Sequence, residues 1–146
     1  MLCPASLTLK PLAAKLAKDK DFFTKQDPYL IVKIGAQKRR TKTHQNGGKN
    51  PTWSEALVFD LNGTEQMVDI DCFDEDFFTS DDFIANCTFT IQELVQRPSG
   101  QNWFRMTRKG GKNGGELLVC WDYRPQAGNG YAGAQQSAMM FNSMAM

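Results

Sequence analysis

Residues 68–73 read Val-Asp-Ile-Asp-Cys-Phe, an alternation of apolar and acidic side chains that decides the class of fold. With a period of two, Val68, Ile70 and Cys72 fall on one face of an extended strand and the aspartates fall on the other. Similar short apolar runs recur along the chain, separated by turns such as Asn46-Gly47-Gly48 and Asn62-Gly63. The predicted strands are 6–16, 28–34, 39–44, 52–61, 66–73, 83–91, 101–106 and 115–123.

Helical signal is confined to a turn or two near Gln92–Gln96, which Pro98 ends. An α/β fold would need several helical crossovers, and the sequence contains none of that kind. Eight short strands with so little helix predict an all-β fold, an eight-stranded antiparallel β-sandwich.

The 146 residues suffice for one domain with a buried core, which we assign to residues 1–124. Residues 125–146 are mostly Gly, Ala, Gln, Ser and Asn, which predicts a disordered tail. The alternative is that the methionine-rich end, Met139–Met146, docks on a protein partner or a lipid surface. No uncharged apolar run approaches the ~20 residues that span a bilayer, so we expect a cytoplasmic protein.

Metal ligands of the zinc type are sparse, because the four cysteines lack CxxC spacing and His44 is the only histidine. Cys72, Cys87 and Cys120 fall in apolar strand-like segments. This pattern favours buried free thiols in a reducing compartment over disulfides.

Charge is strongly segregated although the net charge is only +1. No acidic residue occurs from Pro28 to Ser54, and no basic residue occurs from Asp69 to Asp82. The acidic segment also holds the second copy of Asp-Phe-Phe-Thr-x-x-Asp, a motif found at residues 21–27 and 76–82. Both copies fall between predicted strands, so both are expected to be connecting loops.

Carboxylates that converge from two such loops would repel one another unless solvated or neutralised. An all-oxygen site on flexible loops suits calcium better than magnesium, which prefers a rigid octahedron. An EF-hand is excluded, because the sixth and twelfth positions counted from Asp74 are Thr79 and Ala85. The remaining alternative is a set of solvated acidic loops.

These segments together resemble the C2 domains, the calcium- and phospholipid-binding β-sandwiches of protein kinase C, the synaptotagmins and many small stand-alone proteins. The resemblance covers roughly residues 6–123. The matching segments are Asp27-Pro28-Tyr29, Arg40-Thr41-Lys42-Thr43, Asn50-Pro51-x-Trp53-x-Glu55 and Asp74-x-Asp76-x5-Asp82-Phe83-Ile84.

The resemblance implies that five aspartates coordinate calcium and that the backbone carbonyls of Lys20 and Glu75 add ligands. The five are Asp21, Asp27, Asp74, Asp76 and Asp82. One departure is Ala85, where the family usually has Gly. The closing segment, residues 115–121, suggests the permuted strand order of phospholipase-type members.

The phenylalanines of the two motif copies are expected at the loop tips, where exposed rings would insert into a membrane; the alternative is that some fold back onto the core. They are Phe22, Phe23, Phe77 and Phe78. On the basic strands, Lys33, Arg40 and Lys42 are expected to contact anionic headgroups, and by the resemblance such strands can recognise phosphoinositides. A solvated basic face is the alternative.

The sequence therefore predicts a calcium-dependent, peripheral membrane-binding module for anionic phospholipids. The alternative is a calcium-independent adaptor that holds a protein partner, or self-associates, through a sandwich face or the Met-rich tail. Nucleic acid is not expected as a partner, because the acidic pole would repel phosphate. Nor is catalysis: a metal-assisted hydrolase needs a base beside the metal, and His44 is expected in the basic strand, away from it. Trp53 and Trp121 are expected in the core.

Overall fold

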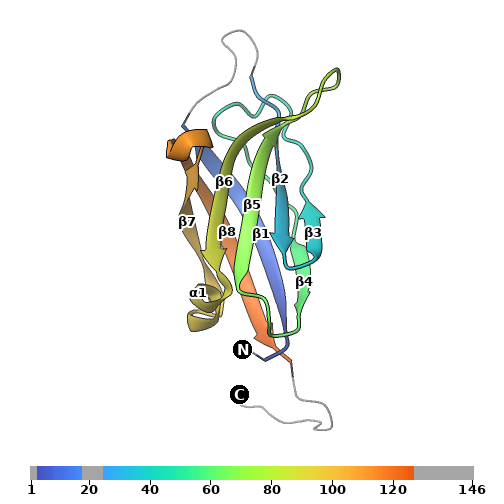
Figure 1. Ribbon diagram of the computed structural model, residues 1–146, viewed down its shortest axis with the longest axis vertical. Coiled ribbons are helices and arrows are strands. Elements are labelled where there is room, and N and C mark those ends of the chain that lie inside the picture. The colour runs from blue at the N-terminus through green and yellow to red at the C-terminus, as the bar shows by residue number, and fades with distance from the viewer. Residues whose placement is uncertain (1–2, 18–24, 127–146) are drawn as a thin grey trace.

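Eight antiparallel strands form two packed layers in the computed structural model, which describes residues 3–17 and 25–126 (Figure 1). The strands are β1 (Ala5–Leu16), β2 (Pro28–Ile34), β3 (Gln37–Arg40), β4 (Leu57–Leu61), β5 (Met67–Asp74), β6 (Asp82–Thr90), β7 (Ser99–Thr107) and β8 (Asn113–Pro125). One short helix, α1 (Ile91–Gln96), and a single 3-10 turn, η1 (Lys109–Gly111), complete the described elements. The predicted all-β sandwich is confirmed.

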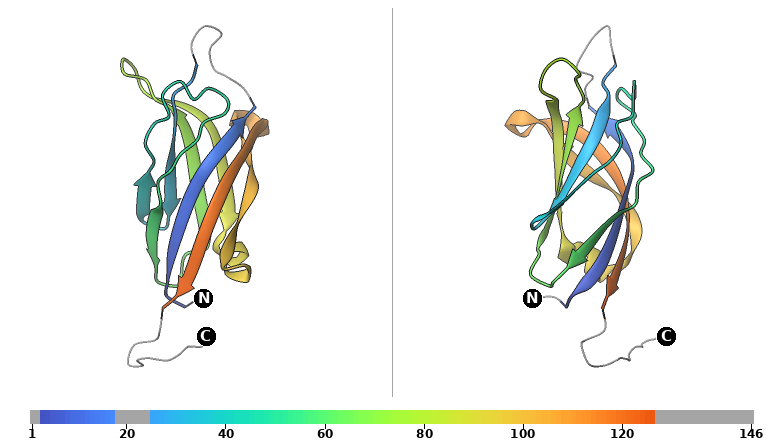
Figure 2. Two further views of the ribbon diagram at one scale, coloured as in Figure 1. Left: turned by 180° about the vertical axis from the view of Figure 1, so that it is seen from behind. Right: turned by 90° about the vertical axis from the view of Figure 1, so that its right-hand side faces the viewer.

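The strands hydrogen-bond in the order β3-β2-β5-β6-β7-β8-β1-β4. Strands β6 and β7 pair only at Asn86 and Thr107, so the sheet folds over there and its two halves face each other (Figure 2). The last strand, β8, pairs with β1 from Ala5 to Leu16. The last described strand therefore lies beside the first, as the permuted order requires.

Alternation along β5 places its residues as the sequence predicts. Val68, Ile70 and Cys72 are fully buried, whereas Asp69 and Asp71 face outward. The core between the layers is contiguous, and its largest fully buried side chains are Phe59, Leu7, Leu9, Leu30, Ile34 and Ile70. Each such side chain contributes about 1.5–3 kcal/mol by leaving water.

Two predicted strands are shorter in the structure. The strand expected at 39–44 ends at Arg40, because the Thr41 hydroxyl accepts from the Leu30 backbone N–H at 2.9 Å and replaces a ladder bond. The strand expected at 52–61 begins at Leu57, and its earlier part keeps only one isolated bridge, Ala13 with Thr52. Lys42 therefore lies beyond the end of β3.

The short helix α1 lies at the lower end of the sandwich in Figure 1. Thr90 and Glu93 form a reciprocal capping box that starts α1. The beginning of β1 and the end of β8 also lie at this lower end, and the connection between β5 and β6 lies at the opposite end.

Trp53 and Trp121 are buried in or against the core, as expected, with 7% and 4% of their surface exposed. All four cysteines are free thiols: Cys72 and Cys87 are buried, Cys120 is half-buried and Cys3 is exposed.

Gly115, opposite Leu16 near the start of β8, has no room for a side chain. Its φ is +106°, and a Cβ there would lie 1.9 Å from the Lys15 carbonyl oxygen. We expect Gly115→Ala to lower the free energy of unfolding by more than the about 1–3 kcal/mol that the backbone conformation alone costs. Urea denaturation measures this change.

Gly110→Ala is the matched control, because Gly110 has φ +78° but a Cβ there would have no atom within 4 Å. Equal destabilisation by the two substitutions would show that the close carbonyl contact at Gly115 carries no cost.

Candidate functional site

Asp27 and Asp74 meet where β2 begins and β5 ends. The ladder pairs Pro28 with Asp74, and the Asp27 backbone N–H donates to Asp74 Oδ1 at 2.8 Å. The Glu75 N–H donates in turn to the Asp27 carbonyl at 3.0 Å. Asp74 is 8% exposed, so its carboxylate is fixed in a nearly dry position.

Asp82 lies on the other side of Asp74, because the β5–β6 ladder pairs these two residues. Asp27 is anchored from a third loop, since the Asn46 N–H donates to Asp27 Oδ1 at 2.7 Å. The structure thus brings three of the predicted calcium ligands to adjoining strand ends.

Asp76 turns its carboxylate into its own loop, the β5–β6 loop (residues 75–81). Its Oδ1 accepts from the backbone of Phe78 at 2.9 Å and of Thr79 at 3.3 Å, and its Oδ2 accepts from the Thr79 hydroxyl at 2.8 Å. This Asx-type turn gives the loop its shape. These three contacts occupy most of the positions at which the Asp76 carboxylate can accept, so a bound cation would compete with them.

Among residues 3–17 and 25–126, no three His, Cys, Asp or Glu side chains lie close enough together to hold a metal ion. The fifth predicted ligand, Asp21, and the carbonyl of Lys20 lie outside the described residues. The donors present are carboxylate oxygens, one of them nearly buried, which is the chemistry that calcium selects.

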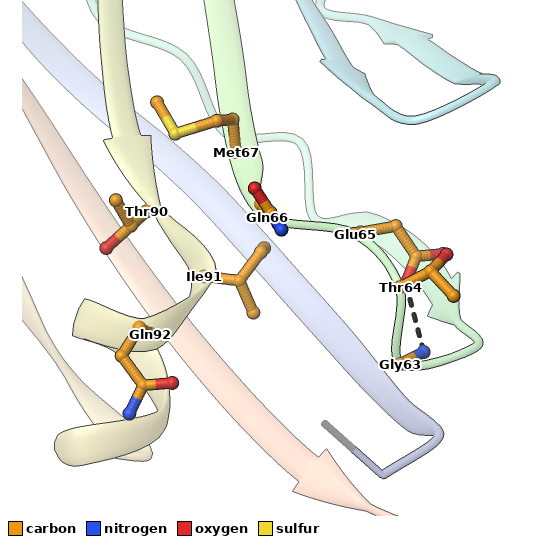
Figure 3. Close-up of a pocket in the computed structure, with 8 residues that line it drawn as sticks. All are labelled: Gly63, Thr64, Glu65, Gln66, Met67, Thr90, Ile91 and Gln92. Carbon is orange, nitrogen blue, oxygen red and sulfur yellow. Dashed lines mark hydrogen bonds between the residues drawn. The ribbon is translucent and has the colours of Figure 1, made fainter. Parts of the chain in front are cut away.

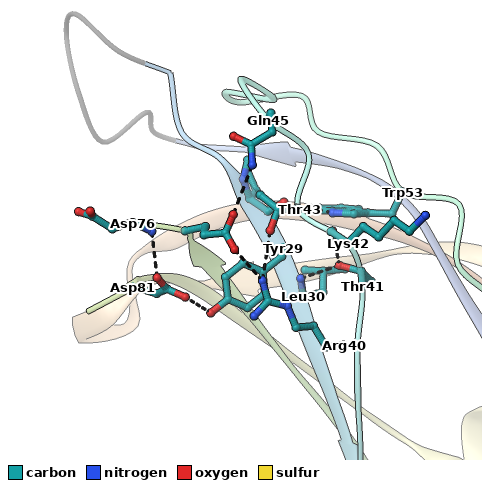
Figure 4. A network of polar contacts seen from close by, with 12 residues as sticks. Tyr29, Leu30, Arg40, Thr41, Lys42, Thr43, Gln45, Trp53, Asp76 and Asp81 are labelled. Atoms are coloured by element: carbon teal, nitrogen blue, oxygen red, sulfur yellow. Dashed lines mark hydrogen bonds and ion pairs between the residues drawn. The ribbon is translucent and has the colours of Figure 1, made fainter. Parts of the chain in front are cut away.

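A contact that the sequence did not reveal joins Tyr29 to Asp81 (Figure 4). The Tyr29 hydroxyl donates to Asp81 Oδ2, and the other oxygen of Asp81 accepts from the Asp76 N–H at 2.9 Å. Desolvation, with the Asp81 contact second, raises the pKa of Tyr29 to about 12. The hydrogen bond from Tyr29 is the largest cause of the lowered pKa of Asp81. Spacing along the chain carried no signal for this pair.

Arg40 connects the basic strand to the acidic loop. Its guanidinium lies over the Tyr29 ring, 3.7 Å from the centroid, and its Nη2 is 3.0 Å from Glu75 Oε2 (Figure 4). Gln45 donates to the other Glu75 oxygen at 3.3 Å. Arg40 is therefore already paired with an anion of the β5–β6 loop.

The other two residues predicted to bind lipid, Lys33 and Lys42, differ in whether they pair with an acidic side chain. Lys33 lies between Asp71 and Asp69, at 3.3 and 3.6 Å, and its pKa is raised chiefly by the contact with Asp71. Lys42 is exposed and makes no ion pair with any described residue. Of the three, Lys42 is the cation most accessible to an anionic headgroup.

Two of the four predicted membrane-inserting phenylalanines lie on the β5–β6 loop and face solvent. Phe77 is 76% exposed and Phe78 is 95% exposed, so neither folds back onto the core. Phe22 and Phe23 lie outside the described residues.

His44 lies in the loop that follows β3 and not on a strand, which corrects the sequence-based placement. Its Nδ1 accepts from the Thr52 N–H at 2.9 Å, and its backbone N–H donates to the Pro28 carbonyl at 2.9 Å. The ring thus stabilises the loop that carries Asn46.

A cavity of about 510 Å³ opens at the opposite end of the sandwich, beside α1 (Figure 3). The residues that line it are Gly63, Thr64, Glu65, Gln66, Met67, Thr90, Ile91 and Gln92. Its one carboxylate, Glu65, accepts backbone hydrogen bonds from Asn62 and Gly63 at 3.1 Å. The walls offer no cluster of groups for chemistry.

Comparison with known proteins agrees with this geometry. The family model for the C2 domain matches residues 5–106. The chain belongs to the C2 domain family.

Among curated relatives, this C2 domain is 33% identical over 95 residues to 16 kDa phloem protein 1 of Arabidopsis thaliana, a match that covers 62% of this chain and 61% of that protein. The matches span 61%, 47% and 43% of the lengths of three such relatives, or about half.

Solved structures share the fold. A C2 domain-containing protein from a putative elicitor-responsive gene superposes with a TM-score of 0.76 at 21% identity, over 89% of this chain and 96% of that one. A calcium-bound structure of two C2 domains of extended synaptotagmin 2 gives 0.73 at 20% identity, over 87% of this chain and 48% of that one. In the described part of this C2 domain, no helix is long and apolar enough to cross a membrane.

Tyr29→Phe keeps the ring beneath Arg40 and removes only the hydroxyl that donates to Asp81. We expect the pKa of Asp81 to rise toward its ordinary value, as measured by NMR titration of the carboxyl carbon. Because the folded-state pKa of Asp81 is depressed, its contribution to stability exists above the unfolded pKa and disappears as pH falls through the folded pKa. The stability deficit of the variant should therefore shrink in that acidic range.

Tyr123→Phe is the control, because Tyr123 is likewise buried but lies on β8 near the opposite end. An Asp81 pKa that is the same in wild type and Tyr29→Phe would mean that the hydroxyl does not hold this carboxylate.

Proposed function

We propose that this C2 domain binds anionic phospholipid membranes peripherally, and that calcium held by the aspartate cluster switches the binding on. The aspartate cluster comprises Asp21, Asp27, Asp74, Asp76 and Asp82. The observation that carries the proposal is that Phe77 and Phe78, 76% and 95% exposed, project from the loop whose two ends hold Asp74 and Asp82.

Calcium is supported by the chemistry of the donors. Asp74 is nearly buried and has two other carboxylate residues at adjoining strand ends, and a divalent cation bound among carboxylates lowers the repulsion between them. The backbone carbonyls of Lys20 and Glu75 are expected to complete an all-oxygen set. Asp76 would join by releasing Thr79, so loading reshapes the β5–β6 loop.

Membrane contact is supported by the exposed rings. An aromatic ring gains up to ~1.5–3 kcal/mol on full transfer from water, and less when insertion is shallow. Calcium would remove the negative charge that otherwise keeps this loop away from anionic lipid, so both steps act at one end of the molecule.

Headgroup phosphates would then be contacted by the basic residues Lys42, Arg40 and Lys33. Lys42 is the exposed member, whereas Arg40 must exchange Glu75 and Lys33 must exchange its aspartates for a lipid phosphate. A phosphoinositide, which carries several phosphates, is the headgroup best able to compete for Arg40.

Calcium binding to the folded state should raise the thermal midpoint of wild type, by the equivalent of about 2.7 kcal/mol at a hundred times the dissociation constant. In Asp74→Asn/Asp76→Asn the calcium-dependent rise should disappear, because two ligands lose their charge. Differential scanning calorimetry with and without calcium measures both.

Asp60→Asn/Asp122→Asn is the control, with two carboxylates neutralised on β4 and β8. A wild-type midpoint that millimolar calcium leaves unmoved would favour the calcium-independent adaptor, with residues 125–146, largely outside the described residues, as the segment to delete next.

Phe77→Ala/Phe78→Ala should weaken calcium-dependent sedimentation with phosphatidylserine vesicles by about 10- to 100-fold, since each 1.4 kcal/mol is tenfold. The calcium-dependent thermal shift should persist, because neither side chain is a ligand.

Val58→Ala/Met67→Ala removes the other large exposed apolar side chains of the described residues, which are 49% and 44% exposed and lie away from this loop. If both double variants sediment alike, insertion of the β5–β6 loop is refuted while calcium binding can still stand.

A further inference from the structure

The β7–β8 connection carries a cluster of positive charge that the proposed function does not use. Residues 108–112 read Arg-Lys-Gly-Gly-Lys, and we refer to them as the basic turn. From Gln101 to Gly115 the chain has no Asp or Glu. The nearest acid along β8, Glu116, is paired in register with Lys15 on one side and Arg105 on the other.

The backbone of the basic turn is fixed by its own hydrogen bonds. The Arg108 N–H donates to the Lys112 carbonyl at 2.8 Å, and the Gly111 N–H donates to the Arg108 carbonyl at 3.1 Å. Arg108 Nε also donates to the Asn113 carbonyl at 2.9 Å, which fixes that side chain against the turn.

The two glycines place the turn clear of the rest of the protein. Gly110 and Gly111 have φ values of +78° and +77°, and a Cβ on either would have no atom within 4 Å. Lys109 and Lys112 are exposed, and neither forms an ion pair with any residue in the described ranges. Two ammonium groups are thus presented to solvent on a rigid support.

Topology places the basic turn at the same end of the sandwich as the aspartates. Strand β6 leaves that end at Asp82, and β7 returns antiparallel to it, with Thr107 opposite Asn86. The Ala17 N–H donates to the Gly114 carbonyl at 3.1 Å, so the turn also adjoins the end of β1. It juts from the side of this end, below the tip of the β5–β6 loop (Figures 1 and 2).

We propose that the basic turn is a second contact surface for anionic phospholipid headgroups, separate from the basic strands and active without calcium. The inference rests on the proposed function for its partner, a membrane. A planar array of headgroups can meet the turn and the phenylalanine loop together when the domain tilts. The negative potential of such a surface attracts each nearby lysine and decays within about 10 Å at 0.1 M salt.

A membrane fits this surface better than a nucleic acid does. A phosphate polymer laid along the turn would approach the carboxylate of Asp82 on the neighbouring strand β6, and then that of Asp74 opposite it on β5, which repel it. A lipid surface can engage the turn from the side while the acidic loop stays in solvent or fills with cation.

The test is Lys109→Ala/Lys112→Ala, which leaves every backbone hydrogen bond of the turn in place. At about 1 kcal/mol per lysine, affinity for vesicles of phosphatidylcholine and phosphatidylserine should fall roughly 30-fold at low salt, with and without calcium. The difference should vanish at high salt, and the calcium-dependent thermal shift should equal that of wild type.

Arg97→Ala/Arg124→Ala is the matched control, with the same change in net charge at the opposite end of the sandwich. Its vesicle affinity should stay near that of wild type. If the two double variants bind equally well, the basic turn is not a lipid contact, and the calcium proposal is untouched.

Other outcomes separate the two proposals. Wild-type protein could bind vesicles in a salt-sensitive manner that does not depend on calcium but requires Lys109 and Lys112. That result would support the basic turn as a lipid contact and refute the calcium switch. Wild-type protein that binds no vesicles under any condition would refute both. Release from vesicles by inorganic phosphate at constant ionic strength would assign the turn to free phosphate and overturn the membrane contact.

Discussion

The register of β5 is the constraint on which the site depends. The ladder sets Pro28 opposite Asp74 on one side and Asp82 opposite Asp74 on the other, so one residue fixes three loop ends. A slip of one residue would turn Val68, Ile70 and Cys72 out of the core. Burial of the apolar face of β5 therefore decides where these carboxylates meet.

A bulge adjusts this register where it matters. Between Cys72 and Phe73 the β5–β6 pairing shifts, because Ala85 faces Cys72 while Phe83 faces Phe73, which leaves Ile84 as the extra residue. If the pairing continued without this shift, Asp74 would face Phe83 and not Asp82. Ala85, the departure from the family's glycine, is fully buried here, so its methyl group packs into the core.

The sequence predicts the features that depend on periodicity, namely the strands and their buried faces. It does not predict contacts between side chains of different loops. The alternation in β5 and the short apolar runs elsewhere indicated the strands, and the exposure of Phe77 and Phe78 follows from their place between Asp76 and Asp82. Two contacts join residues far apart in the sequence: the Tyr29–Asp81 hydrogen bond spans 52 residues and the Arg40–Glu75 pair spans 35. The Asp76 carboxylate turns inward within one irregular loop. No periodicity of the sequence predicts such side-chain directions. The basic turn was not singled out from the sequence, and only the topology places it at the same end of the sandwich as Asp82.

The basic residues near the acidic loop divide into those that form ion pairs within the domain and those that do not. Arg40 and Lys33 pair with Glu75, Asp69 and Asp71, so these cations stabilise the fold before any ligand arrives. Lys42, Lys109 and Lys112 are not paired in this way among the described residues, and they flank the acidic loop from two sides. On the proposed function, the calcium-free end is a negative loop between positive flanks, held near anionic lipid but not inserted. A bound divalent cation then reverses the charge of the acidic loop only. The lysines on either side and the exposed phenylalanines then all favour contact with the membrane.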